Sequence, residues 1–241
     1  MNIKKWIGTV LCMVCMLPLC AQIVWQPVEP GVWKGVVGTP EAYSLLEVAG
    51  CTPQKEGFKR LPEVGLPEWA GKIVGNVQDG KTSLRIPLQK KEQLYGFGLN
   101  FQTVHQRGKI LNLHTDHYGG KDNGRTHAPV PFYVSSRGYG IFINSARYLT
   151  VYAGTGARKD SPKAPVAKDR NTDKTWVARP YSDAVSVLVP AGGVEIYLFA
   201  GPAPMDVVRR YNLFCGGGNL PPRWGLGFTQ RTQKLYTAGQ V

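Results

Sequence analysis

The stretch Asn219-Leu220-Pro221-Pro222-Arg223-Trp224-Gly225-Leu226-Gly227-Phe228-Thr229-Gln230 indicates how this chain is organised. It joins a stiff double proline to an apolar run that is typical of a buried strand. The following residues, Lys234 to Val241, have the pattern of the first turns of a helix. A strand followed by a helix is half of a βαβ unit, and a parallel strand needs neighbours on both sides. We therefore expect this stretch to begin a second domain of a longer protein.

Short apolar runs of β type precede this stretch, and turn residues such as Asp79-Gly80 separate them. The expected strands are Ser44–Ala49, Ile73–Val77, Thr82–Leu88, Gln93–Phe97, Phe132–Ser135, Tyr139–Asn144, Leu149–Tyr152, Ala184–Val189 and Val194–Phe199. Ser136-Arg137-Gly138 and Ala191-Gly192-Gly193 resemble hairpin turns between adjacent runs. Many short strands without helices between them predict a mainly β protein with a β-sandwich.

One helix is expected after the sandwich, from Ala203 to Cys215. Four residues at helical spacing form its apolar stripe: Val207, Val208, Tyr211 and Phe214. Pro204 suits the first turn, and Gly216 suits the left-handed position after the last turn. Gly216-Gly217-Gly218 then forms a hinge. We expect a sandwich domain over residues 22–213, and a linker with the start of the next domain over residues 214–241.

The first 21 residues have the pattern of a secretory signal peptide. Lys4 and Lys5 precede an apolar run from Trp6 to Leu19, and Leu19-Cys20-Ala21 resembles a cleavage site. The apolar run is short for a membrane span. Lipid attachment at Cys20 is less favoured, because Leu19 is larger than the residue that usually precedes a lipidated cysteine. We expect a secreted protein, periplasmic or extracellular, that does not span a membrane.

The cysteine content excludes a disulfide scaffold. Of the five cysteines only Cys51 and Cys215 lie beyond the signal region, and the sequence leaves open whether they pair. The net charge of +13 raises the question of nucleic-acid binding. The basic residues are spread along the chain rather than grouped between aromatic residues, and their densest group lies in a loop-like segment, so no nucleic-acid partner is expected. That group is Arg158, Lys159, Lys163, Lys168 and Arg170.

Four segments carry short motifs rich in glycine, proline and aromatic residues. They are Glu92-Gln93-Leu94-Tyr95-Gly96-Phe97-Gly98; Asn112-Leu113-His114-Thr115-Asp116; Pro129 to Val134 with Gly138 to Asn144; and Gly201 to Tyr211 with Pro222 to Phe228. In this order they resemble the N-terminal region of glycoside hydrolase family 31, the α-glucosidase and α-xylosidase group. The resemblance covers roughly residues 92–241.

The resemblance implies a galactose-mutarotase-like β-sandwich, followed by a helix, a hinge and the first βα element of a truncated (β/α)8 barrel. It also implies a retaining hydrolase of α-linked oligosaccharides, which needs two carboxylates about 5–5.5 Å apart. In the family both are aspartates on later barrel strands, so no catalytic residue and no activity are expected in this chain. None of Asp116, Asp122, Asp160, Asp169, Asp173, Asp183 and Asp206 matches either motif. No cofactor is expected, and the missing barrel is the expected partner.

The resemblance assigns Asp116 a contact with sugar hydroxyls, since the family's aspartate in this loop reaches over the barrel mouth. His117 and Tyr118 are weaker substrate-binding candidates beside it. His114 and His117 next to a carboxylate also raise the question of a metal site, but a Gly-rich loop supports zinc poorly, so no metal is expected. Glycines in these motifs are expected at turns, bulges or close strand approaches. Four aromatic residues are expected in the core: Tyr95, Phe97, Phe132 and Phe142.

The expected barrel strand departs from the family pattern. Arg231 lies one position earlier than the family's arginine, and Tyr236 lies one position later than the aromatic residue that flanks the sugar pocket. Tyr236 remains a substrate-binding candidate, but the departure weakens any statement about the sugar. Trp224 is expected to anchor the strand against the sandwich. The alternative function is a stand-alone carbohydrate-binding β-sandwich without catalysis, for which the segment from Pro221 to Gln230 has no evident purpose.

Overall fold

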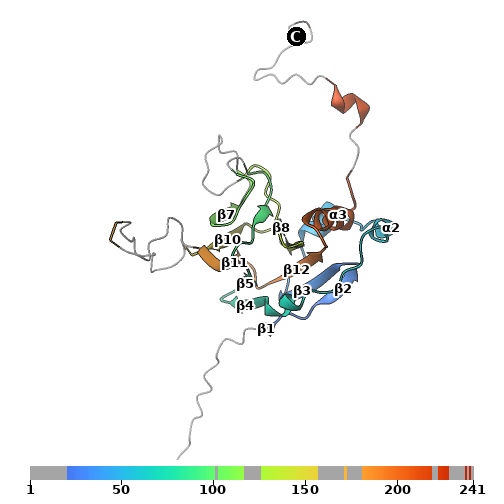
Figure 1. The fold of residues 1–241 in the computed structure, drawn as a ribbon. Coiled ribbons are helices and arrows are strands. Elements are labelled where there is room, and N and C mark those ends of the chain that lie inside the picture. The colour runs from blue at the N-terminus through green and yellow to red at the C-terminus, as the bar shows by residue number, and fades with distance from the viewer. Residues whose placement is uncertain are drawn as a thin grey trace, which may run out of the picture.

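The computed structural model describes residues 21–100, 103–116, 126–156, 171–172, 181–218 and 222–227, with residues 237 and 239. Its strands form two antiparallel sheets, which confirms the mainly β sandwich (Figure 1). Sheet A has the order β1 (Ala21–Gln22), β4 (Val74–Gln78), β5 (Lys81–Pro87), β11 (Tyr181–Val189), β10 (Leu149–Thr155), β7 (Lys109–Leu113). Sheet B has the order β2 (Gln26–Glu29), β3 (Val32–Gly38), β12 (Gly193–Ala200), β9 (Tyr139–Asn144), β8 (Phe132–Ser135), β6 (Leu94–Gly96).

The inner core lies between the two sheets and is mostly aliphatic. Residues two apart on each strand face it, as the period of a pleated strand requires. Sheet A contributes Leu84, Ile86, Val151, Val185, Val187 and Val189, and sheet B contributes Ile141, Ile143, Val194, Ile196 and Leu198, all nearly inaccessible to solvent. The β4–β5 hairpin keeps this register through Asp79 and Gly80, whose φ angles of 50° and 69° suit a type I′ turn.

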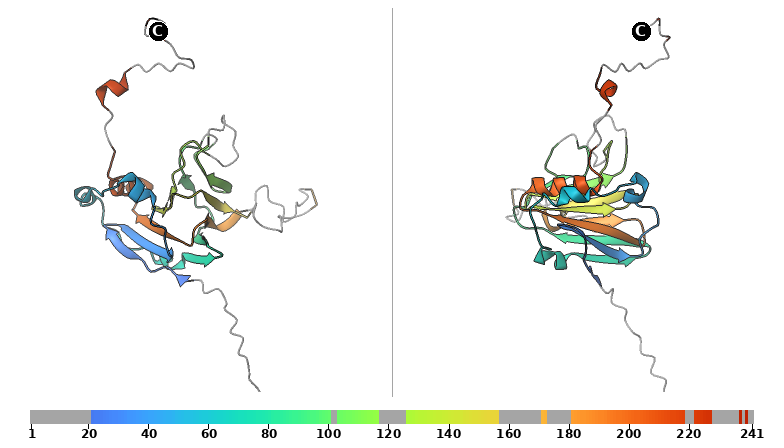
Figure 2. Two further views of the ribbon diagram at one scale, coloured as in Figure 1. Left: turned by 180° about the vertical axis from the view of Figure 1, so that it is seen from behind. Right: turned by 90° about the vertical axis from the view of Figure 1, so that its right-hand side faces the viewer.

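An outer layer covers the other face of sheet B. The helix α3 (Pro204–Phe214) packs on β12, β9 and β8, and α2 (Lys55–Phe58) packs on α3 (Figure 2). The ring of Tyr211 stacks on Phe132 with centroids 3.8 Å apart. Sheet B therefore buries apolar residues on both of its faces. Pro204 and Gly216 lie where expected, with Gly216 at φ +90°, but Val208 is 42% exposed rather than part of the packed stripe.

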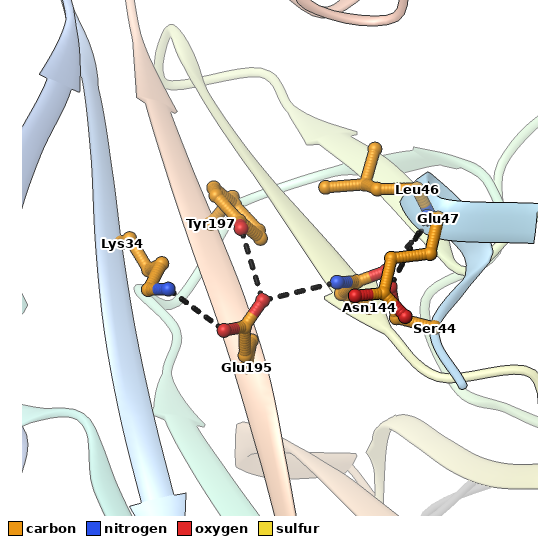
Figure 3. A network of polar contacts seen from close by, with 7 residues as sticks. All are labelled: Lys34, Ser44, Leu46, Glu47, Asn144, Glu195 and Tyr197. Atoms are coloured by element: carbon orange, nitrogen blue, oxygen red, sulfur yellow. Dashed lines mark hydrogen bonds and ion pairs between the residues drawn. The ribbon is translucent and has the colours of Figure 1, made fainter. Parts of the chain in front are cut away.

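A polar network crosses the same outer face beside the aromatic residues (Figure 3). The Glu195 carboxylate on β12 accepts hydrogen bonds from Lys34 on β3, Asn144 on β9 and Tyr197. The Asn144 side-chain oxygen in turn accepts from the backbone N–H of Leu46, 3.2 Å away. The network thus ties three strands to the first turn of a short helix.

That helix, α1 (Leu45–Ala49), replaces the strand expected at Ser44–Ala49. Its caps explain the difference. The Ser44 hydroxyl accepts from the Glu47 N–H at 3.3 Å, and Gly50 adopts a left-handed φ of 60°. The apolar run was compatible with either structure, and capping with packing on the outer layer selected the helix. The structure also adds four strands that were not expected, β1, β2, β3 and β7, together with α2 and the 3-10 helix η1 (Glu68–Lys72).

Ala191-Gly192-Gly193 is not a hairpin turn. It leads from β11 in sheet A to β12 in sheet B, so it carries the chain from one layer to the other. Gly193 allows this crossing because an added Cβ would lie 2.3 Å from backbone atoms of Thr39. Ser136-Arg137-Gly138, by contrast, does connect the paired strands β8 and β9.

The prediction of a strand after Pro222 is also wrong for the residues that the structure describes. Arg223–Leu226 forms a 3-10 turn, η2, in which the Gly225 N–H donates to the Pro222 carbonyl at 2.8 Å. Leu226 is 73% exposed, and neither sheet includes these residues. A single extended segment without a hydrogen-bonded neighbour has nothing to hold it as a strand. The side chain of Trp224 lies outside the described part.

Several other expectations concern residues outside the described part. These are the signal peptide up to residue 20, the basic loop at 158–170, residues 228–236 and most of the helix expected after Lys234. Among the described residues, no helix has the length and apolar character needed to cross a bilayer.

Candidate functional site

Asp116 lies just beyond the end of β7, where the predicted loop begins. The whole of β7 pairs with β10, and Leu113 at its end lies opposite Leu149. Beyond the strand, Thr115 forms an isolated bridge with Thr126, and the Asp116 N–H donates to the Thr126 carbonyl at 3.1 Å. These contacts hold the two ends of segment 117–125 side by side. The half-buried Asp116 is thereby placed where that segment begins.

The turn around Gly98 supports the other end of the loop. The Leu99 N–H donates to the Ala128 carbonyl at 3.1 Å, and the Thr126 hydroxyl donates to the Leu99 carbonyl. An added Cβ on Gly98 would lie 2.1 Å from the Ala128 carbonyl oxygen, and its φ is +93°. Only glycine fits such a close approach. Gly98 therefore allows a close approach of two backbone segments, as expected for the glycines of these motifs.

Phe97, between Gly96 and Gly98, is under backbone strain. Its φ of 65° is uncommon for a residue with a side chain, and its ring is fully buried. The ring stacks on Tyr133 with centroids 5.0 Å apart. Burial and stacking offset the strain, so the motif is a rigid support for the Asp116 loop. Phe97, Phe132 and Phe142 are core residues as expected, whereas Tyr95 is only half-buried.

A small cleft of about 180 Å³ adjoins the foot of this loop, and we call it the loop cleft. It is lined by Leu45, Leu113, Thr115, Pro129, Pro131, Ser145, Ala146, Arg147, Tyr148 and Leu149. At its rim the ring of His114 lies against Tyr148, with centroids 4.1 Å apart, and Tyr148 is 65% exposed. The exposed ring of Tyr148 offers an apolar face to a polar ligand at this rim.

An ion pair borders the loop cleft. Arg147 donates from Nε and Nη2 to the Glu41 carboxylate, with a shortest distance of 2.6 Å. Because of the hydrogen bond from Arg147, the pKa of Glu41 is lowered from 4.5, and the pair stays ionised at neutral pH. The positive charge of Arg147 is therefore largely neutralised at this rim.

A second, larger cleft of about 600 Å³ lies at the opposite end of β7, and we call it the edge cleft. It is lined by Leu88, Lys90, Lys91, Glu92, Gln93, His105, Arg107, Ser182 and Asp183. Arg107 donates to the Gln89 and Glu92 carbonyls at 2.7 and 2.6 Å, so it braces the wall. Burial, with the charges of Arg107 and Lys109, lowers the pKa of His105 below 6.5, which keeps its ring neutral at pH 7.

Residues 53–151 match the family described as the glycosyl hydrolase 31 N-terminal galactose mutarotase-like domain. Over these residues the chain is similar to a glycosyl hydrolase 31 N-terminal domain. This match includes β6, β7 and the strands that support the Asp116 loop.

Curated proteins are also similar to this chain. The chain is 25% identical over 136 residues to the α-xylosidase XylQ of Lactiplantibacillus pentosus, which covers 56% of this chain and 15% of the relative. It is 25% identical over 150 residues to an α-xylosidase of Emericella nidulans, covering 62% of this chain and 16% of the relative. The chain thus spans about one sixth of the length of these relatives.

A solved structure supports the fold. The family 31 dextranase of Flavobacterium johnsoniae, complexed with glucose, superimposes with a TM-score of 0.57 at 19% sequence identity. The match covers 86% of this chain and 27% of the dextranase chain. At this identity the likeness concerns the fold alone.

The structure places one of the four candidate binding residues. Asp116 lies at the foot of its loop, whereas His117, Tyr118 and Tyr236 lie outside the described residues. Within the described ranges, no three His, Cys, Asp or Glu side chains gather as a metal site.

Sequence reasoning missed Tyr148 and the Arg147–Glu41 pair as neighbours of the Asp116 loop. Tyr148 lies in the β9–β10 connection, and only the pairing of β10 with β7 brings it to His114. The one available signal was an exposed aromatic residue between two strands, Ser145-Ala146-Arg147-Tyr148, which is a weak indication by itself.

Proposed function

We propose that this chain is the N-terminal part of a secreted, retaining α-glycoside hydrolase that acts on α-linked oligosaccharides. In this proposal residues 22–213 form a cap over a catalytic (β/α)8 barrel whose first residues follow from position 214. The observation that carries the proposal is the match of residues 53–151 to the family 31 N-terminal domain. The α-xylosidase relatives, of which the chain spans about one sixth, support it.

The cap supplies substrate contacts rather than catalysis. Retaining hydrolysis needs a nucleophile and an acid/base carboxylate about 5–5.5 Å apart. We place both aspartates in the barrel, outside this chain, and we expect residues 1–241 by themselves to be inactive. Asp116, held by its backbone hydrogen bond to Thr126, accepts hydrogen bonds from sugar hydroxyls at the barrel mouth, and the Tyr148 ring beside His114 adds an apolar face.

We further propose that residues 1–21 direct export of the protein, which would then be periplasmic or extracellular. The charged start, the apolar run and Leu19-Cys20-Ala21 support it. A cysteine-linked lipid at Cys20 is the less favoured alternative. The mass of the N-terminal peptide of the exported protein distinguishes cleavage before Gln22 from a lipidated Cys20.

The test begins with the DNA downstream of Val241, read in all frames for barrel strands, and with the protein that includes them. In that protein Asp116→Asn lowers kcat/KM on aryl α-xylosides or α-glucosides by roughly 10- to 100-fold, because a hydrogen bond to a charged acceptor contributes about 1.5–3 kcal/mol. The matched control is Asp79→Asn, in the β4–β5 turn on the far side of sheet A, which keeps an Asx-Gly turn and full activity.

Two outcomes contradict the proposal. If the kcat/KM of Asp116→Asn stays within twofold of the parent value, Asp116 makes no important contact with the substrate. Turnover of an α-glycoside by residues 1–241 alone removes the assignment of both catalytic carboxylates to the barrel. A monomeric chain that binds an α-glycan tightly, with no barrel encoded downstream, favours the alternative of a stand-alone binding module.

A further inference from the structure

Two cysteines that are far apart in the sequence meet at the end of α3. Cys51 follows Gly50, the residue that ends α1, and Cys215 is the C-cap of α3. Both are half-buried free thiols, and Cys51 lies near enough to Cys215 to raise its pKa. They are the two cysteines that lie beyond the proposed signal peptide.

The backbone around the pair is held on both sides. The Gln54 N–H donates to the Leu213 carbonyl at 2.9 Å, and the Gln54 side-chain amide donates to the Gly216 carbonyl at 2.6 Å. A Cβ added to Gly216 would lie 3.2 Å from the Thr52 carbonyl oxygen. Residues 52 and 54, just after Cys51, therefore contact residues 213 and 216 on either side of Cys215. Such contact holds the two cysteines in adjoining segments, and a disulfide requires Cα atoms about 4.4–6.8 Å apart.

We propose that Cys51 and Cys215 form an intrachain disulfide. The two thiols give up two protons and two electrons to a disulfide donor, either glutathione disulfide or the active-site disulfide of an oxidoreductase. One thiolate attacks the donor and releases a donor thiolate, and the resulting mixed disulfide is then attacked by the second cysteine, which releases the other donor thiolate. In the cell this step rests on the proposed export, since disulfides persist in oxidising compartments. The chemistry itself does not depend on export.

The disulfide links two segments of the outer layer at the point where the chain leaves the sandwich. It fastens the last turn of α3 to the segment between α1 and α2, just before the Gly216-Gly217-Gly218 hinge. It also closes a loop of about 160 residues, which restricts the unfolded chain. The structural consequence is that motion of the following residues begins at Gly216 rather than inside α3.

The competing interpretation is that both thiols are small packing residues. Cys215 does contact the outer layer, and Tyr211 lies beside it. Burial raises the pKa of Cys215 to about 11, an effect that the Tyr211 hydrogen bond opposes and Cys51 reinforces. Cys215 is thus mostly a thiol at neutral pH, and a disulfide donor at mildly alkaline pH gives the sharper test.

The test maps disulfides in the full chain after incubation with glutathione disulfide at about pH 8.5, alkylation of free thiols and non-reducing tryptic digestion. The expected product is peptide Gly35–Lys55 linked to Tyr211–Arg223, which separates on reduction. The oxidised chain should melt on the order of 10 °C above the reduced chain, and the Cys51→Ala and Cys215→Ala variants should lose both effects. Cys12, Cys15 and Cys20 fall in the separate peptide Trp6–Lys34, so mispaired forms differ in mass.

Alkylation or glutathionylation of Cys51 and Cys215 without a linked pair overturns the inference, as does a link to Trp6–Lys34. A different result would contradict the proposed export. If the purified chain forms the bond while the chain recovered from cells is reduced and retained in the cytoplasm, the export proposal fails and the Cys51–Cys215 inference stands.

Discussion

Glu92 and Glu195 each accept three hydrogen bonds, but they do so in opposite surroundings. The Glu92 carboxylate is 3% exposed and accepts from Ser135 at 2.6 Å, from the Gln89 N–H at 2.8 Å and from the Tyr139 hydroxyl. The Glu195 side chain is 24% exposed and accepts from Lys34, Asn144 and Tyr197 at distances of 2.7 to 3.1 Å (Figure 3). The Glu92 network is buried beside the inner core, and the Glu195 network lies on the outer face of sheet B.

The difference teaches that the surroundings, rather than the number of bonds, decide the strength of a network. Water can replace a lost partner at Glu195 but has little access to Glu92. A buried donor left unsatisfied costs its full desolvation, about 1–3 kcal/mol. Burial, with Tyr133 and Glu92 nearby, also raises the pKa of Tyr139 well above 10, so this residue remains a neutral donor.

The largest expected effect is that of Glu92→Leu. The substitution leaves the donors of Ser135, Tyr139 and Gln89 without their acceptor, and we expect a loss of about 3–5 kcal/mol in the free energy of unfolding. The matched variant Glu195→Leu should cost about 1 kcal/mol or less, because the side chains of Glu195 and Lys34 are 24% and 29% exposed and water can reach the charged pair. Urea unfolding of both variants measures the difference, and equal losses would contradict the comparison.

A pair of tyrosine variants sharpens the comparison by removing one hydroxyl from each network. Tyr139→Phe should lower the free energy of unfolding by about 1.5–3 kcal/mol, as expected for a buried hydrogen bond to a charged group. Tyr197→Phe should cost under about 1 kcal/mol. Both rings keep their packing, so thermal unfolding at one pH isolates the hydroxyl. A larger loss at Tyr197 would reverse the order of the two networks.

The smallest effect concerns pH. Burial raises the pKa of Glu195, but hydrogen bonds from Lys34, Asn144 and Tyr197 outweigh it and lower the pKa below 4.5. The stabilisation is therefore present above pH 4.5 and is lost as the pH falls through the folded-state pKa. Glu195→Gln should remove this component. The difference between parent and variant, about 1 kcal/mol or less at pH 7, should shrink toward pH 3 in urea titrations. A difference that grows on acidification would refute the sign.

The regular strands of the sandwich were predictable from the sequence because period and turns agree. Phe132–Ser135 and Tyr139–Asn144 match β8 and β9 at both ends, and the short connection between them allows only an antiparallel hairpin. The segment Val32–Gly38 was missed because glycine interrupts its alternation. In the fold Gly35 is required, since an added Cβ would lie 2.4 Å from the Ile23 side chain.

The candidate site was predictable only in part. The motif ending in Asp116 indicated a loop after a short apolar run, and the structure holds its foot against Thr126. The contact of His114 with Tyr148 depends on the pairing of β7 with β10, which no local pattern specifies. The meeting of Cys51 with Cys215 likewise depends on α3 lying beside residues 51–54.

The amino-acid sequence by itself determined where most strands and the helix α3 form, because alternation, caps and turn residues act over a few positions. Only the tertiary structure decided which layer each strand joins. Ala191-Gly192-Gly193 shows the limit, since the same residues suit a hairpin and a crossing between sheets. Alternation specifies that a strand has a buried face, but the partner of that face is selected by packing between segments far apart in the chain.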